Sequence, residues 1–187
     1  MTFQQLKTLI RSDLYRYTGK VSTRLLLMNL LRNPGFQYSF YLRISHYARS
    51  NRNWPLYVIA KMWMEHYSCK YGIFVSTTNI GSGFYIGHFS GIFVGGEIGK
   101  NCNVSQGVTI GHSNRGKNKG LPTLGDNVYV GPGAKIVGNV KIGNNVAIGA
   151  NCVVTKDIPD NAVVVGIPGK VISYNGSTGY INNTDYL

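Results

Sequence analysis

The sequence predicts a mainly β fold, in which short strands wind into a three-sided prism behind an α-helical N-terminal region. Three observations support this prediction. An aliphatic residue returns at every sixth position from Ile80 to Ile110 and again from Leu124 to Val154. Residues 111–123 interrupt that repeat. Residues 1–72, which precede it, combine positive charge with the apolar spacing of helices.

Residues 1–72 are predicted to form a basic α-helical cap. Helical spacing covers residues 3–17, 22–31, 36–49 and 55–71, and glycine or proline breaks it near residues 19, 34–35 and 53–55. The segment holds eleven Lys and Arg against Asp13 and Glu65, a net charge of +9 within the chain's +12. Its apolar faces are expected to pack on the repeat or on a neighbouring subunit, or alternatively to contact an anionic membrane. We expect no nucleic-acid partner, because no nucleic-acid motif accompanies the charge.

The hexad repeat predicts a stack of short strands in residues 73–172. Strands alternate with period two and helices with about 3.6, so aliphatic residues in strict sixes fit neither pattern alone. In a three-sided coil each hexad forms one face, its leading aliphatic points inward, and about eighteen residues complete a turn. The leading aliphatics are Ile80, Ile86, Ile92, Ile98, Val104, Ile110, Leu124, Val130, Ile136, Ile142, Ile148 and Val154. Compact residues four places later are expected to complete the core, namely Ser90, Gly96, Cys102, Ala134, Val140, Val146 and Cys152.

The interruption at residues 111–123 is predicted to be a loop inserted between two hexads. It carries His112, Arg115, Lys117 and Lys119. A solenoid whose regularity serves only stability explains the hexads but not this polar insertion. Because long loops in compact folds are commonly functional, we place the functional site near it.

The remaining features of the chain indicate a cytoplasmic protein. Cys69, Cys102 and Cys152 lack the spacing of a disulfide framework or a thiolate metal site. The first residues lack the order of a signal peptide, and no apolar run is long enough to span a bilayer. Residues 173–187 are polar and are expected to form a mobile C-terminal tail, to which we assign no function.

Five motifs carry a resemblance to a known family. They are Tyr85-Ile-Gly-His-Phe-Ser-Gly-Ile92, Ser105-Gln-Gly-Val-Thr-Ile-Gly111, Gly131-Pro-Gly-Ala-Lys-Ile-Val-Gly138, Ile148-Gly-Ala-Asn-Cys-Val-Val154 and Val163-Val-Val-Gly-Ile-Pro-Gly-Lys170. Through them residues 73–172 resemble the hexapeptide-repeat acyltransferases, and within these the serine acetyltransferases and the related O-acetyltransferases of capsule and exopolysaccharide biosynthesis. The resemblance implies a homotrimer and a left-handed parallel β-helix, whose hand is opposite to that of most crossovers.

The resemblance also implies direct transfer of an acetyl group from acetyl-CoA to a hydroxyl, with no tightly bound cofactor and no metal. His88 matches the family's catalytic base, and histidine suits that task because its ordinary pKa lies near neutrality. His112 likewise follows a hexad aliphatic and a glycine, but on a different face of the prism. We hypothesise that His112 and its loop reach the His88 site of a neighbouring subunit. A loop histidine exposed to water is the alternative.

By the same resemblance, the pantetheine arm of acetyl-CoA lies along the second run of hexads. The backbone expected to contact it lies near Gly111, Gly131, Pro132, Gly149 and Ala150. Candidates for binding its phosphates are Arg115, Lys135, Lys156 and Lys170. The alternative for each lysine is a solvated corner of the prism.

Three departures from the serine acetyltransferases bear on the acceptor. Gly87 stands where those enzymes carry an aspartate, Lys119-Gly-Leu-Pro122 replaces an Arg-His pair, and Gly72-Ile-Phe-Val-Ser76 lacks a substrate-binding aspartate. Free serine requires charged partners for its carboxylate and ammonium groups. We therefore predict a sugar, a surface polysaccharide or its precursor as the acceptor. Serine O-acetylation in cysteine biosynthesis is the alternative.

Two classes of protein without transferase activity are open alternatives. Some hexad β-helices hydrate carbon dioxide at a metal held by three histidines, whereas the repeats here hold His88 and His112. A purely structural solenoid should present a flat array of repeated outward residues. The outward positions of this repeat vary, and the loop interrupts one face.

Overall fold

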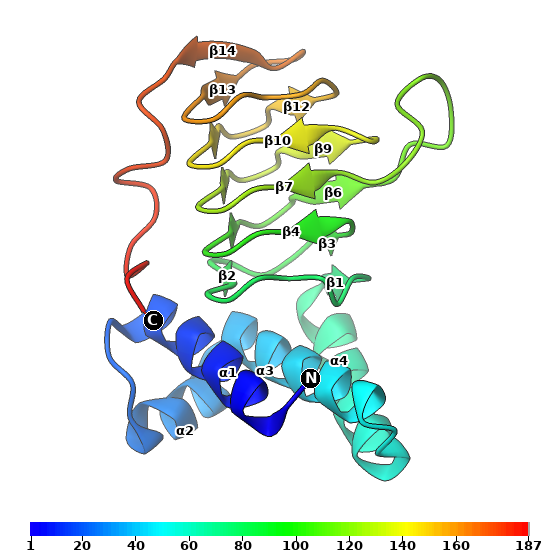
Figure 1. Cartoon of the computed structure of the whole chain (residues 1–187), viewed down its shortest axis with the longest axis vertical. Helices are drawn as coiled ribbons and strands as arrows, with labels where there is room; N and C mark the ends of the chain where they lie inside the picture. The colour runs from blue at the N-terminus through cyan, green and yellow to red at the C-terminus, as the bar shows by residue number, and fades with distance from the viewer. Residues whose placement is uncertain (187) are drawn as a thin grey trace.

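The computed structural model describes residues 1–186, in which a bundle of helices lies beneath a tall stack of short strands (Figure 1). The helices are α1 (Phe3–Thr18), α2 (Thr23–Arg32), α3 (Pro34–Ser50) and α4 (Trp54–Tyr71). These bounds confirm the four helices predicted from the sequence. The N-terminus of each helix is capped by a side-chain oxygen that accepts from a backbone N–H, as is usual for Ser, Thr and Asn at this position. The capping residues are Thr2, Ser22, Asn33 and Asn53. None of the helices described is long and apolar enough to cross a membrane.

The strands form three sheets, which the chain visits in rotation. Sheet A contains β1 (Ile73–Val75), β3 (Ile92–Val94), β6 (Thr109–Gly111), β9 (Lys135–Val137) and β12 (Val153–Val154). Sheet B contains β4 (Glu97–Ile98), β7 (Thr123–Leu124) and β10 (Lys141–Ile142). Sheet C contains β2 (Tyr85–Ile86), β5 (Asn103–Val104), β8 (Tyr129–Val130), β11 (Ala147–Ile148), β13 (Val163–Val165) and β14 (Lys170–Ser173).

The register of these strands confirms the predicted coil. Ile86 pairs with Val104, and Ile136 with Val154, so each hexad lies on the equivalent hexad of the next coil. Val104 pairs in the same way with Val130 across the inserted loop. All strand pairs are parallel except β13 with β14, where the chain reverses after the last coil.

The core of the stack is the predicted row of aliphatic residues. All twelve leading aliphatics are buried, and Cys102 and Cys152 are fully buried with them. Ser90 is an exception to the predicted set of compact core residues, because it is exposed. Its backbone turns through a φ of 102° at a corner of the prism, which directs the residue away from the interior.

The helical region ends the stack by pairing side chains with the backbone of the first coil. The Arg43 guanidinium donates to the carbonyls of Ile80 and Gly81, each at 2.7 Å, and forms an ion pair with Asp13 at 2.9 Å. Asp13 in turn accepts from the backbone N–H of Phe84 at 2.9 Å. The edge of a sheet carries unpaired backbone groups, so these bonds satisfy an edge that no further coil covers.

The C-terminal residues fold back along the stack and return to α1 (Figure 1). Ser177 donates its hydroxyl to the carbonyl of Asn127 at 2.7 Å. The ring of Tyr180 stacks on Tyr129 with 5.0 Å between centroids. Near the end of the described chain, Asp185 accepts a hydrogen bond from the hydroxyl of Tyr15 at 3.0 Å. Residues 173–186 therefore differ from the mobile tail that their polar composition predicts, because these contacts hold them against the stack and against α1; residue 187 lies outside the described residues.

Candidate active site

His88 lies where β2 ends, at the corner between sheets C and A. It is exposed and opens on a cavity of about 360 Å³. Three parts of the chain build this cavity: helix α1, the first coils of the stack and the C-terminal tail. Its lining residues are Arg16, Tyr17, Tyr85, Gly87, His88, Asn103, Val104, Ser105, Tyr129, Tyr180, Asn182 and Asn183.

Helix α1 contributes polar side chains to this cavity. The Tyr17 hydroxyl accepts from the N–H of Ile86 at 2.9 Å and donates to its carbonyl at 3.2 Å. Burial raises the pKa of Tyr17 well above its usual value, so the hydroxyl stays protonated. The Tyr17 ring also packs on Tyr85, with 4.4 Å between centroids. These contacts fix the wall of the cavity next to the strand that ends at His88.

Arg16 brings a charge into the cavity while being only 4% exposed. It donates to the carbonyls of Gly83 at 2.7 Å and Asn182 at 2.8 Å, and to the side-chain oxygen of Asn103. Burial lowers the pKa of Arg16 from its ordinary value, and the residue remains charged at neutral pH because arginine is so strongly basic. No sequence motif marked Arg16, Asn103 or Tyr180, because residues distant in the chain meet here.

His112 follows β6 at the corner between sheets A and B, and it is exposed. It does not line the cavity of His88. The hexad frame predicts this separation, because the two histidines follow different faces of the prism. The loop after His112 is pinned by paired backbone bonds between Ser113 and Gly120, at 3.0 and 3.1 Å.

The residues predicted to bind acetyl-CoA fall into separate groups. Gly131, Pro132, Gly149 and Ala150 occupy the same corner as His88, in later coils. Gly111, Arg115 and Lys156 lie at or beyond the corner that holds His112. Lys170 lies in β14, and the Lys135 ammonium is engaged by the carbonyl of Gly107 and by Thr109. The residues predicted to bind acetyl-CoA therefore do not all lie at one site within a single chain.

Gln106 lies at the corner above His88, and sequence reasoning did not identify it as a candidate site residue. The corner is built by backbone bonds from coil to coil, including Gly107 N–H to Ser90 and Gly133 N–H to Gln106, each 2.9 Å. The side-chain oxygen of Gln106 is buried and has no hydrogen-bond partner among residues 1–186. A buried acceptor of this kind fits a donor from a ligand or from another chain.

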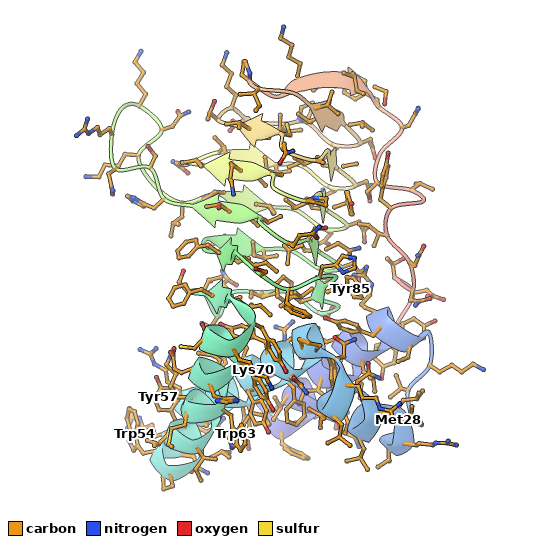
Figure 2. All side chains as sticks on the ribbon, turned by 180° about the vertical axis from the view of Figure 1, so that it is seen from behind. Met28, Trp54, Tyr57, Trp63, Lys70 and Tyr85 are labelled. Atoms are coloured by element: carbon orange, nitrogen blue, oxygen red, sulfur yellow. The ribbon has the colours of Figure 1, made fainter. Side chains whose placement is uncertain are left out.

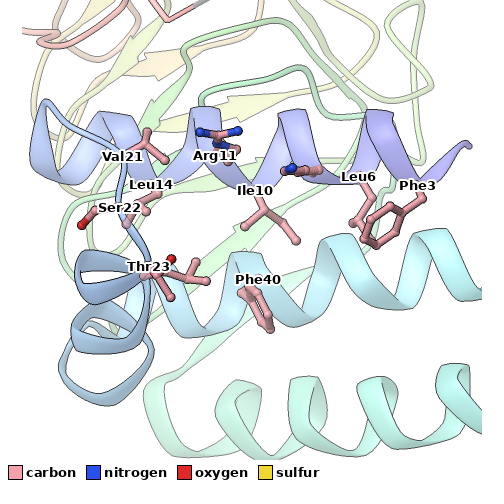
Figure 3. Close-up of a pocket in the computed structure, with 11 residues that line it drawn as sticks. Phe3, Leu6, Ile10, Arg11, Leu14, Val21, Ser22, Thr23 and Phe40 are labelled. Atoms are coloured by element: carbon pink, nitrogen blue, oxygen red, sulfur yellow. The ribbon is translucent and has the colours of Figure 1, made fainter.

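A larger cavity of about 640 Å³ lies away from these residues, between α1, α2 and α3 (Figure 3). Its lining is mainly apolar, with Lys7 and Arg11 among the residues around it. None of the residues predicted to act in catalysis or acetyl-CoA binding lines it. The polar cavity beside His88 is therefore the candidate active site.

Comparison with known proteins gives one family and a consistent set of relatives. Residues 122–156 match the family described as bacterial transferase hexapeptide (six repeats). The serine acetyltransferase of Synechococcus elongatus is 39% identical over 150 residues, which are 79% of this chain and 60% of that protein. That of Bacillus pumilus is 46% identical over 99 residues, which are 52% of this chain and 46% of that protein. The chain thus spans about half to three fifths of these relatives.

Solved structures give the same result at the level of the fold. The crystal structure of Neisseria gonorrhoeae serine acetyltransferase in complex with serine has a TM-score of 0.73 and 29% identity, and the match covers 91% of this chain and 70% of that one. Isoform 3 from Entamoeba histolytica, in complex with cysteine, has a TM-score of 0.69 and 33% identity over 88% of this chain and 59% of that one. These matches confirm the predicted hexapeptide-repeat β-helix with its N-terminal helices.

The comparisons overturn the predicted acceptor. A sugar or polysaccharide acceptor, with a role in capsule or exopolysaccharide biosynthesis, is the wrong prediction, because these relatives are serine acetyltransferases. The prediction rested on charges that are missing from the motifs near His88 along the sequence. The fold supplies a charge that this reasoning did not consider, because Arg16 of α1 enters the cavity from far away in the chain.

Proposed function

We propose that the chain is a hexapeptide-repeat acyltransferase that transfers an acetyl group from acetyl-CoA to the hydroxyl of serine. The polar cavity beside the exposed His88 is the observation that supports this most directly. We propose residues 73–172 as the catalytic β-helix, wound with the left hand of the family, and residues 1–72 as its cap. Cysteine biosynthesis in the cytoplasm is the proposed setting.

In the proposed reaction His88 acts as general base. An imidazole nitrogen takes the proton of the serine hydroxyl, and the oxygen attacks the carbonyl carbon of the thioester. The carbon–sulfur bond then breaks, and the imidazolium returns the proton to the leaving thiolate, giving O-acetylserine and coenzyme A. His88 is exposed at a corner of the stack, where both reactants have access to its ring.

The corner above His88 is the proposed place for the pantetheine arm. Gly131, Pro132, Gly149 and Ala150 continue that corner, and the buried oxygen of Gln106 could accept from a pantetheine amide N–H. Arg115 and Lys156 belong to the other corner, as does His112. We therefore propose a homotrimer in which the loop corner of one subunit faces the His88 corner of the next.

The test of the base is His88→Asn in a coenzyme A release assay with serine. We expect turnover to fall by about 100- to 10,000-fold, the usual contribution of a positioned general base. His66→Asn changes an exposed histidine on α4 and serves as the matched control. Turnover with serine that survives His88→Asn, or no turnover in the unmodified protein, would contradict the proposal.

The shared site predicts complementation between two defective chains. His88→Ala and His112→Ala should each lower activity. In trimers that mix the two variants at random, half of the subunits keep His88 and the other half keep His112. About a quarter of the sites should therefore have both histidines and regain activity. Full activity of His112→Ala alone would remove His112 from the site. Mixed trimers without recovery would place both histidines in the site of one subunit.

We also propose contact between the helical region and an anionic membrane surface. Helices α2 and α4 expose large apolar side chains, among them Leu27, Leu31, Trp54, Met62 and Trp63. Figure 2 labels Trp54 and Trp63 of α4, and Met28 of α2. Both acidic residues of the region are already paired, Asp13 with Arg43 and Glu65 with Lys61, which leaves an outward excess of positive charge.

Sedimentation with lipid vesicles tests this contact. Binding to vesicles rich in phosphatidylserine but not to pure phosphatidylcholine is expected, and Met62→Ser with Trp63→Ser should weaken it. Phe74→Ser, which alters an exposed aromatic residue on β1, is the control. Equal pelleting with both vesicle types, or loss of a larger oligomer in the double variant without loss of lipid binding, would contradict it.

A further inference from the structure

Arg16 carries a charge in the candidate active site and forms no direct ion pair with a carboxylate among residues 1–186. Among residues 1–186, the ion pairs within 4.0 Å join Arg43 to Asp13 and Lys61 to Glu65, and neither includes Arg16. The three hydrogen bonds of its guanidinium all reach neutral oxygens, on Gly83, Asn182 and Asn103. Burying a charge without a partner of opposite charge costs free energy, so this cavity favours an anionic ligand.

The guanidinium also retains donors for such a guest. It carries five N–H groups, of which the Nε group and one on each terminal nitrogen are used in the bonds described above. One N–H therefore remains on each terminal nitrogen. A carboxylate accepts from guanidinium N–H groups in strong, charge-assisted bonds.

The cavity holds this guanidinium in place before any ligand binds. The carbonyl of Asn182, in the C-terminal tail, accepts from Nε at 2.8 Å, and the Asn183 amide donates to the carbonyl of Arg16 at 3.3 Å. The Tyr85 ring lies beneath it, with 5.8 Å between the guanidinium carbon and the ring centroid. A side chain fixed in this way loses little further freedom on binding, which favours affinity.

We propose that Arg16 binds the carboxylate of the acceptor and so selects an amino acid as the hydroxyl donor. The inference rests on the proposed serine acetylation, which it extends by naming the group that recognises the substrate. With the carboxylate on Arg16 and the hydroxyl directed to His88, serine occupies the polar cavity that both residues line. Neutral alcohols lack the group that Arg16 recognises.

The decisive comparison uses serine and serinamide, which differ in that serinamide has an uncharged amide in place of the carboxylate. Arg16→Gln should weaken serine binding about tenfold to a hundredfold, the usual scale for a charge-assisted bond, and leave serinamide binding unchanged. Binding is measured by calorimetry, and turnover separately by coenzyme A release. Arg11→Gln removes one charge from an exposed position on the same helix and is the matched control.

Asn103→Asp tests the charge without removing Arg16. The new carboxylate keeps the bond from the guanidinium and supplies the missing counter-charge, at the loss of one long bond of 3.4 Å from the Asn103 amide to the Tyr180 carbonyl. We expect a folded protein of equal or higher thermal stability, weaker serine binding and unchanged KM for acetyl-CoA. A purely structural Arg16 would instead tolerate Asn103→Asp without any change in serine binding.

The outcomes separate this inference from the proposed function. Serine turnover with equal serine binding in the unmodified protein and in Arg16→Gln would overturn the role of Arg16 and leave serine acetylation intact. A loss shared by serine and serinamide would also overturn it, since the carboxylate would then contribute nothing. Selective serine binding without turnover would support Arg16 and contradict the proposed reaction.

Discussion

The coils and the helical region satisfy the backbone of the same stack by different means. Between coils, backbone bonds to backbone, as from Gly87 N–H to Val104 at 3.0 Å and from Gly131 N–H to Ile148 at 2.8 Å. Below the first coil, side chains of α1 and α3 take over that task. Arg43 donates to Ile80 and Gly81, and Tyr17 bonds to both backbone groups of Ile86.

This difference explains why the candidate active site lies at the first coils of the stack. Each inner coil packs on another coil of the same shape, so the aliphatic residues that point inward recur from one turn to the next. The first coil is ended by individual side chains with no repeat to restrain them, and two of these, Arg16 and Tyr17, also line the cavity of His88. The end of the repeat is thus where polar side chains from outside the repeat reach the cavity of His88.

Breaking the cap at Arg43 should have the largest effect on stability. Arg43→Met leaves the buried Asp13 without its partner at 2.9 Å and removes two bonds to the first coil. Loss of one partner from a buried ion pair costs about 3–5 kcal/mol. Denaturant unfolding at fixed protein concentration measures the change in free energy of unfolding.

Lys61→Met is the matched control for Arg43→Met, because it breaks an exposed pair with Glu65 on one helix face. An exposed pair of this spacing contributes about 0.3–0.5 kcal/mol. Equal costs for the two variants would show that the cap does not depend on the buried pair. The comparison between coils and cap would then lose its main support.

Tyr17→Phe should have the next largest effect. The variant keeps the ring and its packing on Tyr85 but leaves the N–H and carbonyl of Ile86 unpaired. Unsatisfied buried backbone groups cost about 1–3 kcal/mol. Tyr15→Phe, which removes a hydroxyl bonded to the exposed Asp185, is the control and should cost less. Thermal unfolding of the two variants side by side makes the measurement.

The repeat could be predicted from the sequence because the same physical demand recurs at each coil. All twelve leading aliphatics are buried as predicted, and the frame placed His88 and His112 at different corners. Ser90 departed from the frame because the corner at that residue needs a positive φ rather than a filled interior. A regular pattern predicts which residues are buried in a typical coil, but it does not predict a corner whose backbone conformation differs, such as that at Ser90.

The wall of the candidate site could not be predicted, because its contacts join residues far apart in sequence. Arg16 meets Asn103 and Asn182 only once the tail has returned to α1. Helical periodicity gives the face of α1 but not which neighbour its polar residues meet. The prediction of a sugar acceptor counted charges only where the motifs placed them, and so it did not consider Arg16.

The smallest effect should come from the asparagine column at the corner between sheets B and C. Asn101, Asn127, Asn145 and Asn161 share a left-handed backbone, and each amide donates to the next side chain at 2.9–3.1 Å. Asn145→Ala should cost about 1 kcal/mol, because alanine in this conformation is strained and the bonds lost are half exposed. Asn145→Gly, which removes the strain but not the lost bonds, should cost less.

Equivalence along this column is the sharper test. Asn127 and Asn145 each bond to the asparagine of the coil before and of the coil after. The free energies of unfolding of their alanine variants should therefore agree within about 0.5 kcal/mol in denaturant unfolding. Asn101 also donates to the carbonyl of Thr184 in the tail, at 3.2 Å, and its alanine variant should therefore cost more. Equal costs at Asn101 and Asn145 would mean that the tail adds no stability where it meets the first coil. Unequal costs at Asn127 and Asn145 would mean that neighbouring coils are not interchangeable, and the contrast between a uniform stack and a specialised end would fail at its regular part.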